Sequence, residues 1–162
     1  MNDRAVVIGI GNTFRRDDGI GPAVAADIAG RELPGIRVLS CPAEPTAILD
    51  AWQGATRAVL IDAAVGDRPG RIRRSGVDEL AESRSVSSHD LDLRQTFELG
   101  RALGRVPSSI TVVSVDVADT GHGEGLTPSV AAALPEAVRA VLDVLDVLDV
   151  LGTGEESRDQ QP

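Results

Sequence analysis

The sequence contains few aromatic residues and only one cysteine. Aromatic residues make up 2% of the 162 residues, with one tryptophan and no tyrosine, so the core must be built from Val, Leu, Ile and Ala. An aliphatic core of this kind is typical of a parallel sheet covered by helices. The single cysteine, Cys41, excludes an internal disulfide, and we expect it to behave as a small, at least partly buried apolar residue.

The chain also lacks a net positive charge and a long apolar segment ahead of its first strand-like run. Its formal net charge is −9, with a sequence pI near 4.6, which argues against nucleic acid as a partner because phosphate attraction is missing. The opening residues, MNDRAVVIGI, give no indication of export or of a membrane span. We therefore expect a cytoplasmic protein.

Short apolar runs alternate with longer helical patterns along the chain, which indicates βαβ units. We predict strands at Ala5–Ile10, Ile36–Ser40, Ala58–Ile61 and Ile110–Val115, with a weaker antiparallel edge strand at Gly70–Ser75. We predict helices at Gly21–Leu33, Pro45–Gln53, His89–Gly104 and Pro128–Val150. The expected fold is a three-layer α/β/α domain with a twisted, mainly parallel five-stranded sheet and helices on both faces.

The length of the chain suits one domain, which we place at residues 1–151. Residues 152–162 are polar and acidic, and we predict that they form a disordered tail.

Two helix starts carry capping signals: Ser87 with Asp90 fits a capping box, and Thr127 is expected to cap the last helix ahead of Pro128. The repeat VLDVLDVLDVL from Val141 is expected to place its aspartates on a solvated helix face.

The segment GIGNTFRRDDGIG, from Gly9 to Gly21, follows the first predicted strand. A dinucleotide-binding turn would read G-x-G-x-x-G, but Phe14 stands where the third glycine is needed. The paired acids Asp17 and Asp18 would in addition repel a pyrophosphate. The loop is therefore expected to deliver a carboxylate to the carboxyl edge of the sheet, where sites of open α/β folds collect.

Two further residues are expected at that edge. Asp62 ends the strand AVLID, and His89 opens the helix that follows SVSS. Together with Asp18, they form a coherent site for a divalent transition metal that leaves open coordination positions. Each residue also has a plainer interpretation: Asp18 could cap the first helix, Asp62 could bond a neighbouring turn, and His89 could be an exposed residue of a first helical turn.

Read together, GIGNTFRRDDGIG, LIDAAV, SSHDLDL and GLTPSV resemble the hydrogenase maturation endopeptidase family, over Val6 to about Val141. The resemblance implies a twisted five-stranded sheet between helices. It also implies an aspartic-type endopeptidase that removes a C-terminal extension from the large-subunit precursor of a [NiFe] hydrogenase. We expect a monomer that binds no nucleic acid and no membrane.

Carried over residue by residue, the resemblance makes Asp18, Asp62 and His89 the metal-contacting and catalytic residues, while Gly11, Asn12 and Gly19 shape the loop. It further implies that nickel, supplied by the substrate's active site, is the recognition signal, although another divalent metal would also suit these ligands. Hydrolysis could use a metal that polarises the scissile carbonyl, or water activated by Asp18 and Asp62. The sequence does not distinguish between these two mechanisms of hydrolysis.

One departure from the family and two competing interpretations remain. Family members often carry Gly–Ile–x–Pro after the last strand, whereas this chain reads SVDVADTGHGEG, so its substrate selectivity is expected to differ. Asp119–Thr120–Gly121 reproduces the tripeptide of pepsin-like proteases, but those enzymes are all-β. His122 and Glu124 are expected to belong to a glycine-rich connection. The rival function is a non-enzymatic module that binds nickel or a small ligand.

Overall fold

The computed structural model describes the backbone of residues 5–76 and 88–159, and the side chains of residues 5–76 and 93–146. Within this part of the chain, one sheet holds five strands in the order β2-β1-β3-β5-β4. The strands are β1 (Ala5–Ile10), β2 (Ile36–Cys41), β3 (Arg57–Val65), β4 (Ile72–Gly76) and β5 (Ser109–Val117). No described helix is both long enough and apolar enough to span a membrane.

All neighbouring strands run parallel except β4, which pairs antiparallel with β5 at the edge of the sheet. The predicted α/β architecture and its antiparallel edge strand are therefore confirmed. The central strands β3 and β5 extend to Val65 and Val117, beyond the predicted ends. Both extensions lie at the carboxyl edge, where the strands continue into the connecting loops.

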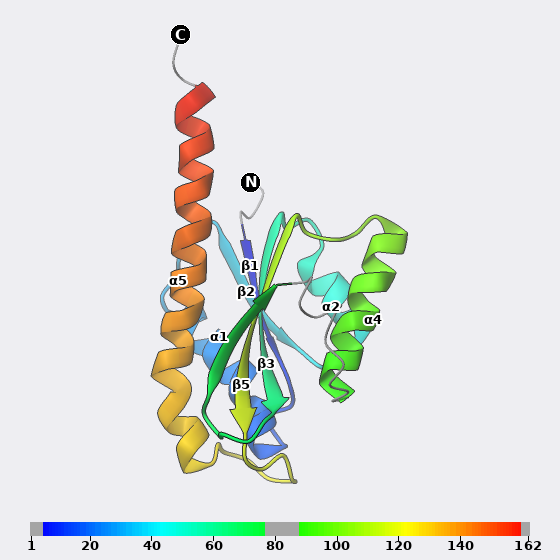
Figure 1. Ribbon diagram of the computed structural model, residues 1–162, viewed down its shortest axis with the longest axis vertical. Helices are drawn as coiled ribbons and strands as arrows, with labels where there is room; N and C mark the ends of the chain where they lie inside the picture. The colour runs from blue at the N-terminus through cyan, green and yellow to red at the C-terminus, as the bar shows by residue number, and fades with distance from the viewer. Residues whose placement is uncertain (1–4, 77–87, 160–162) are drawn as a thin grey trace.

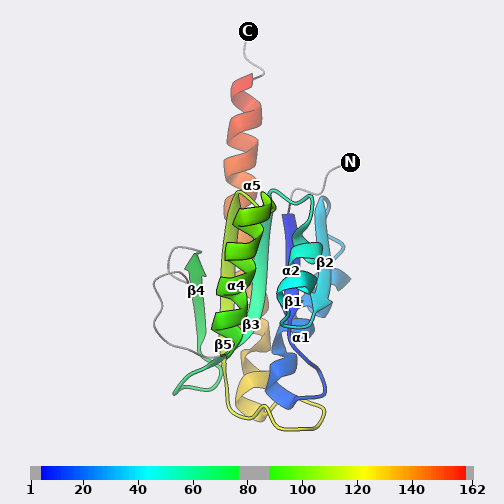
Figure 2. The same cartoon turned by 90° about the vertical axis from the view of Figure 1, so that its right-hand side faces the viewer.

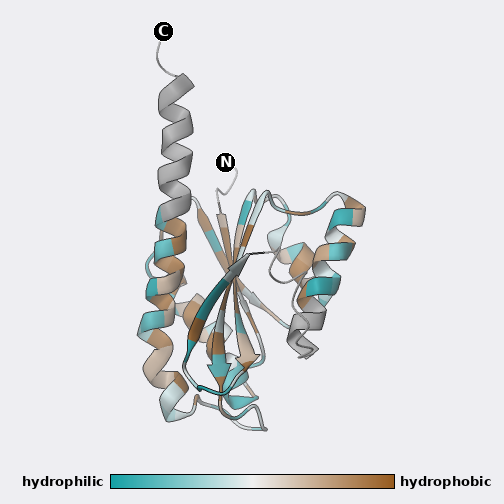
Figure 3. Ribbon diagram, viewed as in Figure 1, coloured by the Kyte–Doolittle hydropathy of each residue, from teal (hydrophilic) through white to brown (hydrophobic). Residues whose placement is uncertain are grey.

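The helices form a layer on each face of the sheet (Figures 1 and 2). Helices α1 (Ile20–Gly30) and α5 (Pro128–Asp159) cover one face, and α2 (Pro45–Trp52) and α4 (Ser88–Leu103) cover the other. A short 3-10 turn, η1 (Arg16–Gly19), precedes α1. Two clusters of aliphatic side chains, one under each layer, make up the core. Figure 3 shows the brown, hydrophobic residues along the strands and helices of this sandwich.

Several predicted helix boundaries are wrong. Helix α1 ends at Gly30 rather than Leu33, because Glu32 takes a positive φ of 49° and Leu33 precedes Pro34, which disfavours helical geometry at Leu33. Helix α5 begins at Pro128 as expected but remains helical through Asp159, past the predicted end at Val150. Helix α5 thus extends into residues 152–162, the segment for which the sequence predicts a disordered tail. The domain boundary at residue 151 stays a prediction.

Candidate active site

Close packing between β1 and α1 determines the path of the glycine loop. Gly21 lies against the carbonyl ends of β1 and β3, since a Cβ atom there would come 2.5 Å from the Ile10 oxygen and 2.6 Å from the Ile61 oxygen. Gly11 has a φ of 148°, and a Cβ atom at this position would collide with the Asp18 carbonyl. The loop therefore folds back on the sheet only with glycine at these positions, and η1 is placed over the carboxyl edge.

Asp18 is held inside this loop by Asn12. Its carboxylate Oδ2 accepts a hydrogen bond from the Asn12 backbone N–H at 2.9 Å, and the residue is 5% exposed. Asn12 in turn accepts the Phe14 N–H through its own side chain, in a local turn. The interpretation of Asp18 as a cap of the first helix is wrong, because the N-cap of α1 is Gly19, without a side-chain capping bond.

Asp17, next to Asp18, has a different function. Its fully buried carboxylate accepts the backbone N–H groups of Ala118, Asp119 and Thr127 and the Thr127 hydroxyl. Burial by itself would raise the pKa of the Asp17 carboxyl, but these hydrogen bonds outweigh burial and hold the pKa below its ordinary value of 3.8. Asp17 thus attaches η1 to the loop between β5 and α5. Its partner Thr127, expected only to cap α5, donates its hydroxyl to this carboxylate.

Asp62 lies in β3 at the same edge of the sheet and is 3% exposed. It follows Ile61, whose carbonyl contacts Gly21 at the start of α1, so the structure brings Asp62 and the loop that carries Asp18 to one edge.

The charge of Asp62 also acts on Cys41 at the end of β2. Burial first, and then the negative charges of Asp62 and Glu44, raise the pKa of the Cys41 thiol to about 11. Cys41 therefore stays a neutral thiol near pH 7 and is no nucleophile.

His89 is the second residue of α4, which begins at the carboxyl edge and runs back along the sheet (Figure 2). Its backbone is therefore at the end of the molecule where Asp18 and Asp62 lie, but its side chain is outside the described side chains. The proposed capping box falls outside them too, at Ser87 and Asp90. Among the side chains described, no three His, Cys, Asp or Glu residues form a cluster able to hold a metal ion.

The loop that follows β5 carries the remaining candidate residues. Its backbone pairs with the glycine loop, since Arg16 donates to the Gly123 oxygen and Gly123 donates to the Phe14 oxygen, both at 2.9 Å. His122 and Glu124 are exposed in this loop. The side chain of Asp119 accepts the Gly121 N–H at 2.8 Å in a local turn. The tripeptide at residues 119–121 is therefore a turn in an α/β protein, and the pepsin-like interpretation is wrong.

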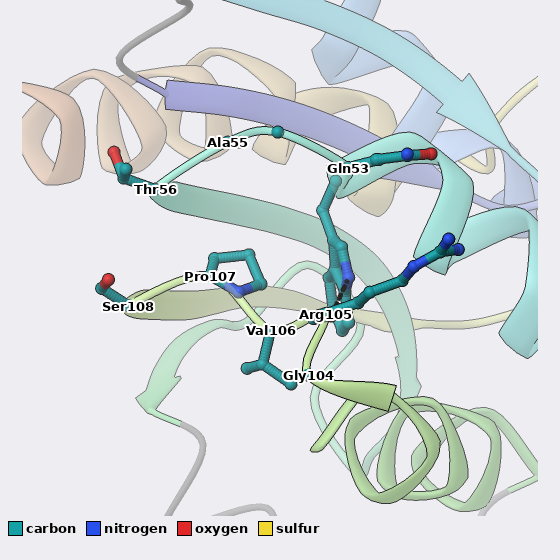
Figure 4. A pocket seen from close by; sticks show the side chains of 10 residues that line it. Gln53, Ala55, Thr56, Gly104, Arg105, Val106, Pro107 and Ser108 are labelled. Carbon is teal, nitrogen blue, oxygen red and sulfur yellow. Dashed lines mark hydrogen bonds between the residues drawn. The ribbon is translucent and has the colours of Figure 1, made fainter. Parts of the chain in front are cut away.

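A cavity of about 370 Å³ lies at the opposite edge of the sheet (Figure 4). It is lined by residues 52–56, ahead of β3, and residues 104–108, ahead of β5. The indole N–H of Trp52 bridges these two loops by donating to the Arg105 oxygen at 2.9 Å. Because this cavity is at the amino ends of the parallel strands, it is separate from the acids at the carboxyl edge.

An open α/β sheet with buried carboxylates at its carboxyl edge defines a class of enzyme-like domains whose chemistry is carried by acids on loops and strand ends. Residues 29–144 match the family model described as HycI, hydrogenase maturation protease. Because this match spans more than half of the chain, the chain belongs to the hydrogenase maturation protease family. It is a peptidase, so the predicted family and enzyme class are confirmed, and the non-enzymatic alternative is not supported.

Individual relatives agree with this assignment. The chain is 26% identical over 145 residues to the hydrogenase 2 maturation protease of Escherichia coli K12, covering 86% of this chain and 88% of that protein. It is similar to a solution structure of an endopeptidase from Escherichia coli, with a TM-score of 0.77, 26% identity and coverage of 88% and 91%. It is also similar to the [NiFe] hydrogenase maturation protease HycI from Thermococcus kodakarensis, with a TM-score of 0.68, 25% identity and coverage of 91% and 93%.

Proposed function

We propose that this chain removes the C-terminal extension of a nickel-loaded [NiFe] hydrogenase large-subunit precursor, acting as a monomer. The observation that supports the proposal most directly is the placement of two buried carboxylates at one edge. Asp18 reaches this edge through η1, and Asp62 reaches it through β3, with Gly21 packed between the ends of the strands. The first turn of α4, which carries His89, starts at the same end of the sheet.

In this proposal nickel belongs to the substrate. Asp18, Asp62 and His89 would engage the ion carried by the precursor, and soft thiolates of the precursor would supply the rest of its coordination. Two carboxylates and a single imidazole are expected to bind free metal weakly, so the protease alone should not retain nickel. The same ligand types would accept another divalent ion, and recognition would then depend on what the precursor carries.

Hydrolysis requires water to attack the scissile carbonyl carbon, the C–N bond to break and a proton to reach the leaving amine. The substrate's metal would polarise the carbonyl and lower the pKa of the attacking water. In the alternative form, Asp18 and Asp62 would activate that water as a carboxylate pair. We favour the first form, because the proposal already places the precursor's nickel beside both acids.

The test compares nickel-loaded and nickel-free precursor as substrates of the purified chain. Shortening of the large subunit is followed by mass spectrometry, which also locates the cleaved bond. The proposal predicts that only the nickel-loaded precursor is shortened. Equal cleavage of both forms would contradict nickel as the recognition signal, and cleavage of neither would contradict the assigned substrate.

A further inference from the structure

A row of polar side chains crosses three strands beside the proposed active site. Asp62 of β3 is in register with Ser114 of β5, and Ser114 is in register with Arg73 of β4. Residues opposite one another in a sheet point to the same face. Leu60 and Val112, which share this face, belong to the core cluster under α2 and α4. Arg73 therefore projects on the same face as Asp62, two strands away.

Asp116 orients the side chain of Arg73 through an ion pair with its guanidinium. Its carboxylate is fully buried, and its Oδ2 atom pairs with Arg73 Nη2 at 3.2 Å. The Oδ1 atom is also buried and has no hydrogen-bond partner among the described residues. Gly66 makes room for this carboxylate, because a Cβ atom there would collide with it. Burying a charged group is costly unless it is paired, and the Arg73 guanidinium compensates the buried Asp116 carboxylate.

Arg73 has donors left for a ligand. Its side chain is 47% exposed, and a guanidinium carries five N–H donors. Within residues 5–76 and 93–146, whose side chains the structure describes, Asp116 engages only the donors at Nη2. A guanidinium held from one side by a buried carboxylate can bind a carbonyl or carboxylate oxygen with its other donors.

The spacing of the strands indicates which residue of a bound peptide would lie next to Arg73. Neighbouring strands lie about 4.8 Å apart, so two strand spacings separate the backbones of Asp62 and Arg73 by about 10 Å. An extended peptide rises about 3.3 Å per residue. An extended precursor chain that crosses the strands from β3 towards β4, with its scissile bond at Asp62, would therefore bring an oxygen to Arg73 about three residues from that bond.

We propose that Arg73 is a substrate-binding residue for an oxygen acceptor of the precursor about three residues from the scissile bond, and that Asp116 positions its guanidinium. This inference rests on the proposed function. Because the contact is remote from the bond that breaks, it should contribute to binding of substrate and transition state alike. Its loss is therefore expected to raise KM and to leave kcat nearly unchanged.

Arg74 provides a matched control. It is the next residue of the same strand, points to the opposite face and pairs with Asp143 of α5 at 3.2 Å, with 46% of its side chain exposed. The experiment compares Arg73→Ala and Arg74→Ala on nickel-loaded precursor. Arg73→Ala should raise KM about tenfold or more, the size expected for a hydrogen bond to a charged group. Arg74→Ala should match the wild type, and equal KM values for the two variants would overturn the inference.

Further variants of Asp116 and Arg73 distinguish a role in substrate binding from a role in stabilising the fold. Asp116→Asn should raise KM in the wild-type background but add nothing in the Arg73→Ala background, whereas a purely structural effect would persist there. Arg73→Lys should recover only part of the affinity, because an ammonium lacks the planar fork. Full additivity of the Asp116 and Arg73 variants would contradict the positioning role. Replacing acidic residues near the cleaved bond of the precursor by amides distinguishes a side-chain carboxylate from a backbone carbonyl as the acceptor.

Binding of the nickel-loaded and of the nickel-free precursor is measured alongside as a dissociation constant, so that the comparison does not require cleavage. A wild-type protein that binds precursor but cleaves neither form would contradict the proposed function. The ratio of the dissociation constants of Arg73→Ala and Arg74→Ala would still test the present inference. A ratio of about ten or more supports it, and a ratio near one overturns it.

Discussion

Two adjacent aspartates in this protein have different environments. The carboxylate of Asp17 faces inward and accepts the backbone N–H groups of the loop that joins β5 to α5, whereas Asp18 accepts the Asn12 N–H at the carboxyl edge. The pair reads as DD in the sequence, and no pattern within the segment tells which acid is structural. The difference depends on residues about 100 positions away, which only the tertiary fold brings together.

Replacing Asp17 by Asn should therefore destabilise the fold. An amide cannot accept with both of its polar atoms, so at least one backbone N–H of the loop loses its partner in a buried site. We expect a loss of about 3 kcal/mol in the free energy of unfolding, measured by denaturant titration. The control is Asp27→Asn, which removes an exposed ion pair with Arg31 and should cost less than about 1 kcal/mol. Equal losses in the two variants would contradict the role of Asp17.

The same carboxylate predicts a dependence of stability on pH. Because the pKa of Asp17 in the folded protein lies below its ordinary value of 3.8, its contribution is present above that value and is lost as the pH falls through the folded pKa. Wild-type stability should therefore fall more steeply than that of Asp17→Asn below about pH 5. Parallel curves in acid would show that Asp17 carries no such contribution.

The pKa of the Cys41 thiol depends in part on the negative charge of Asp62. Burial, Asp62 and Glu44 together raise the pKa of the Cys41 thiol to about 11, so alkylation of the folded protein should rise with pH up to that region. Asp62→Asn removes one of the negative neighbours and should shift the midpoint of the alkylation profile to lower pH. Asp50→Asn, an exposed position on α2, is the control and should leave the midpoint in place. An unchanged midpoint in Asp62→Asn would contradict the charge interaction between Asp62 and Cys41.

At the scale of the elements, the site depends on how closely α1 approaches the sheet. Gly9 and Gly21 lie face to face where β1 ends and α1 begins, and a Cβ atom on either would overlap the backbone of the other element. Glycine is required here by contact across the fold rather than by local turn geometry. Sequence reasoning named Gly11 and Gly19 as loop-shaping residues, but it missed Gly21 as the contact that places the helix.

The substitution Gly21→Ala tests this contact. We expect it to cost several kcal/mol, because the added methyl group meets carbonyl oxygens of two strands that cannot move independently. Gly30→Ala, in the same helix, has open space around the added atom and should stabilise the protein by up to about 1 kcal/mol. Thermal unfolding of the two variants measures both effects. A Gly21→Ala protein as stable as Gly30→Ala would show that α1 does not depend on this approach.

The elements themselves were largely predictable from the sequence, because apolar runs and helical periodicity are local signals. All five strands were predicted near their observed positions, and the arginine-rich alternation of β4 indicated an edge strand. The ends of the helices were not. Local periodicity did not reveal the positive φ of Glu32 that stops α1, nor the continuation of α5 through Gly152 and Gly154.

At the scale of the molecule, the topology of the sheet brings the site together. The strand order β2-β1-β3-β5-β4 puts the carboxyl ends of β1 and β3 side by side, so a loop after one strand meets a residue at the end of the next. That the loop carrying Asp18 and the strand carrying Asp62 share this edge could be predicted, because the carboxyl ends of parallel strands lie together. The Asp116–Arg73 pair could not, since it depends on the antiparallel register of β4, which no local pattern specifies.

The proposed function requires Asp18, Asp62 and His89 to act together on a nickel-loaded precursor. The most direct measurement is the processing rate of that precursor by Asp62→Asn and by His89→Gln, with Asp27→Asn as a surface control and circular dichroism as a check on the fold. Both site variants should stay folded and release no shortened large subunit, while the control should cleave like the wild type. Processing by either site variant at the wild-type rate would contradict the proposed function.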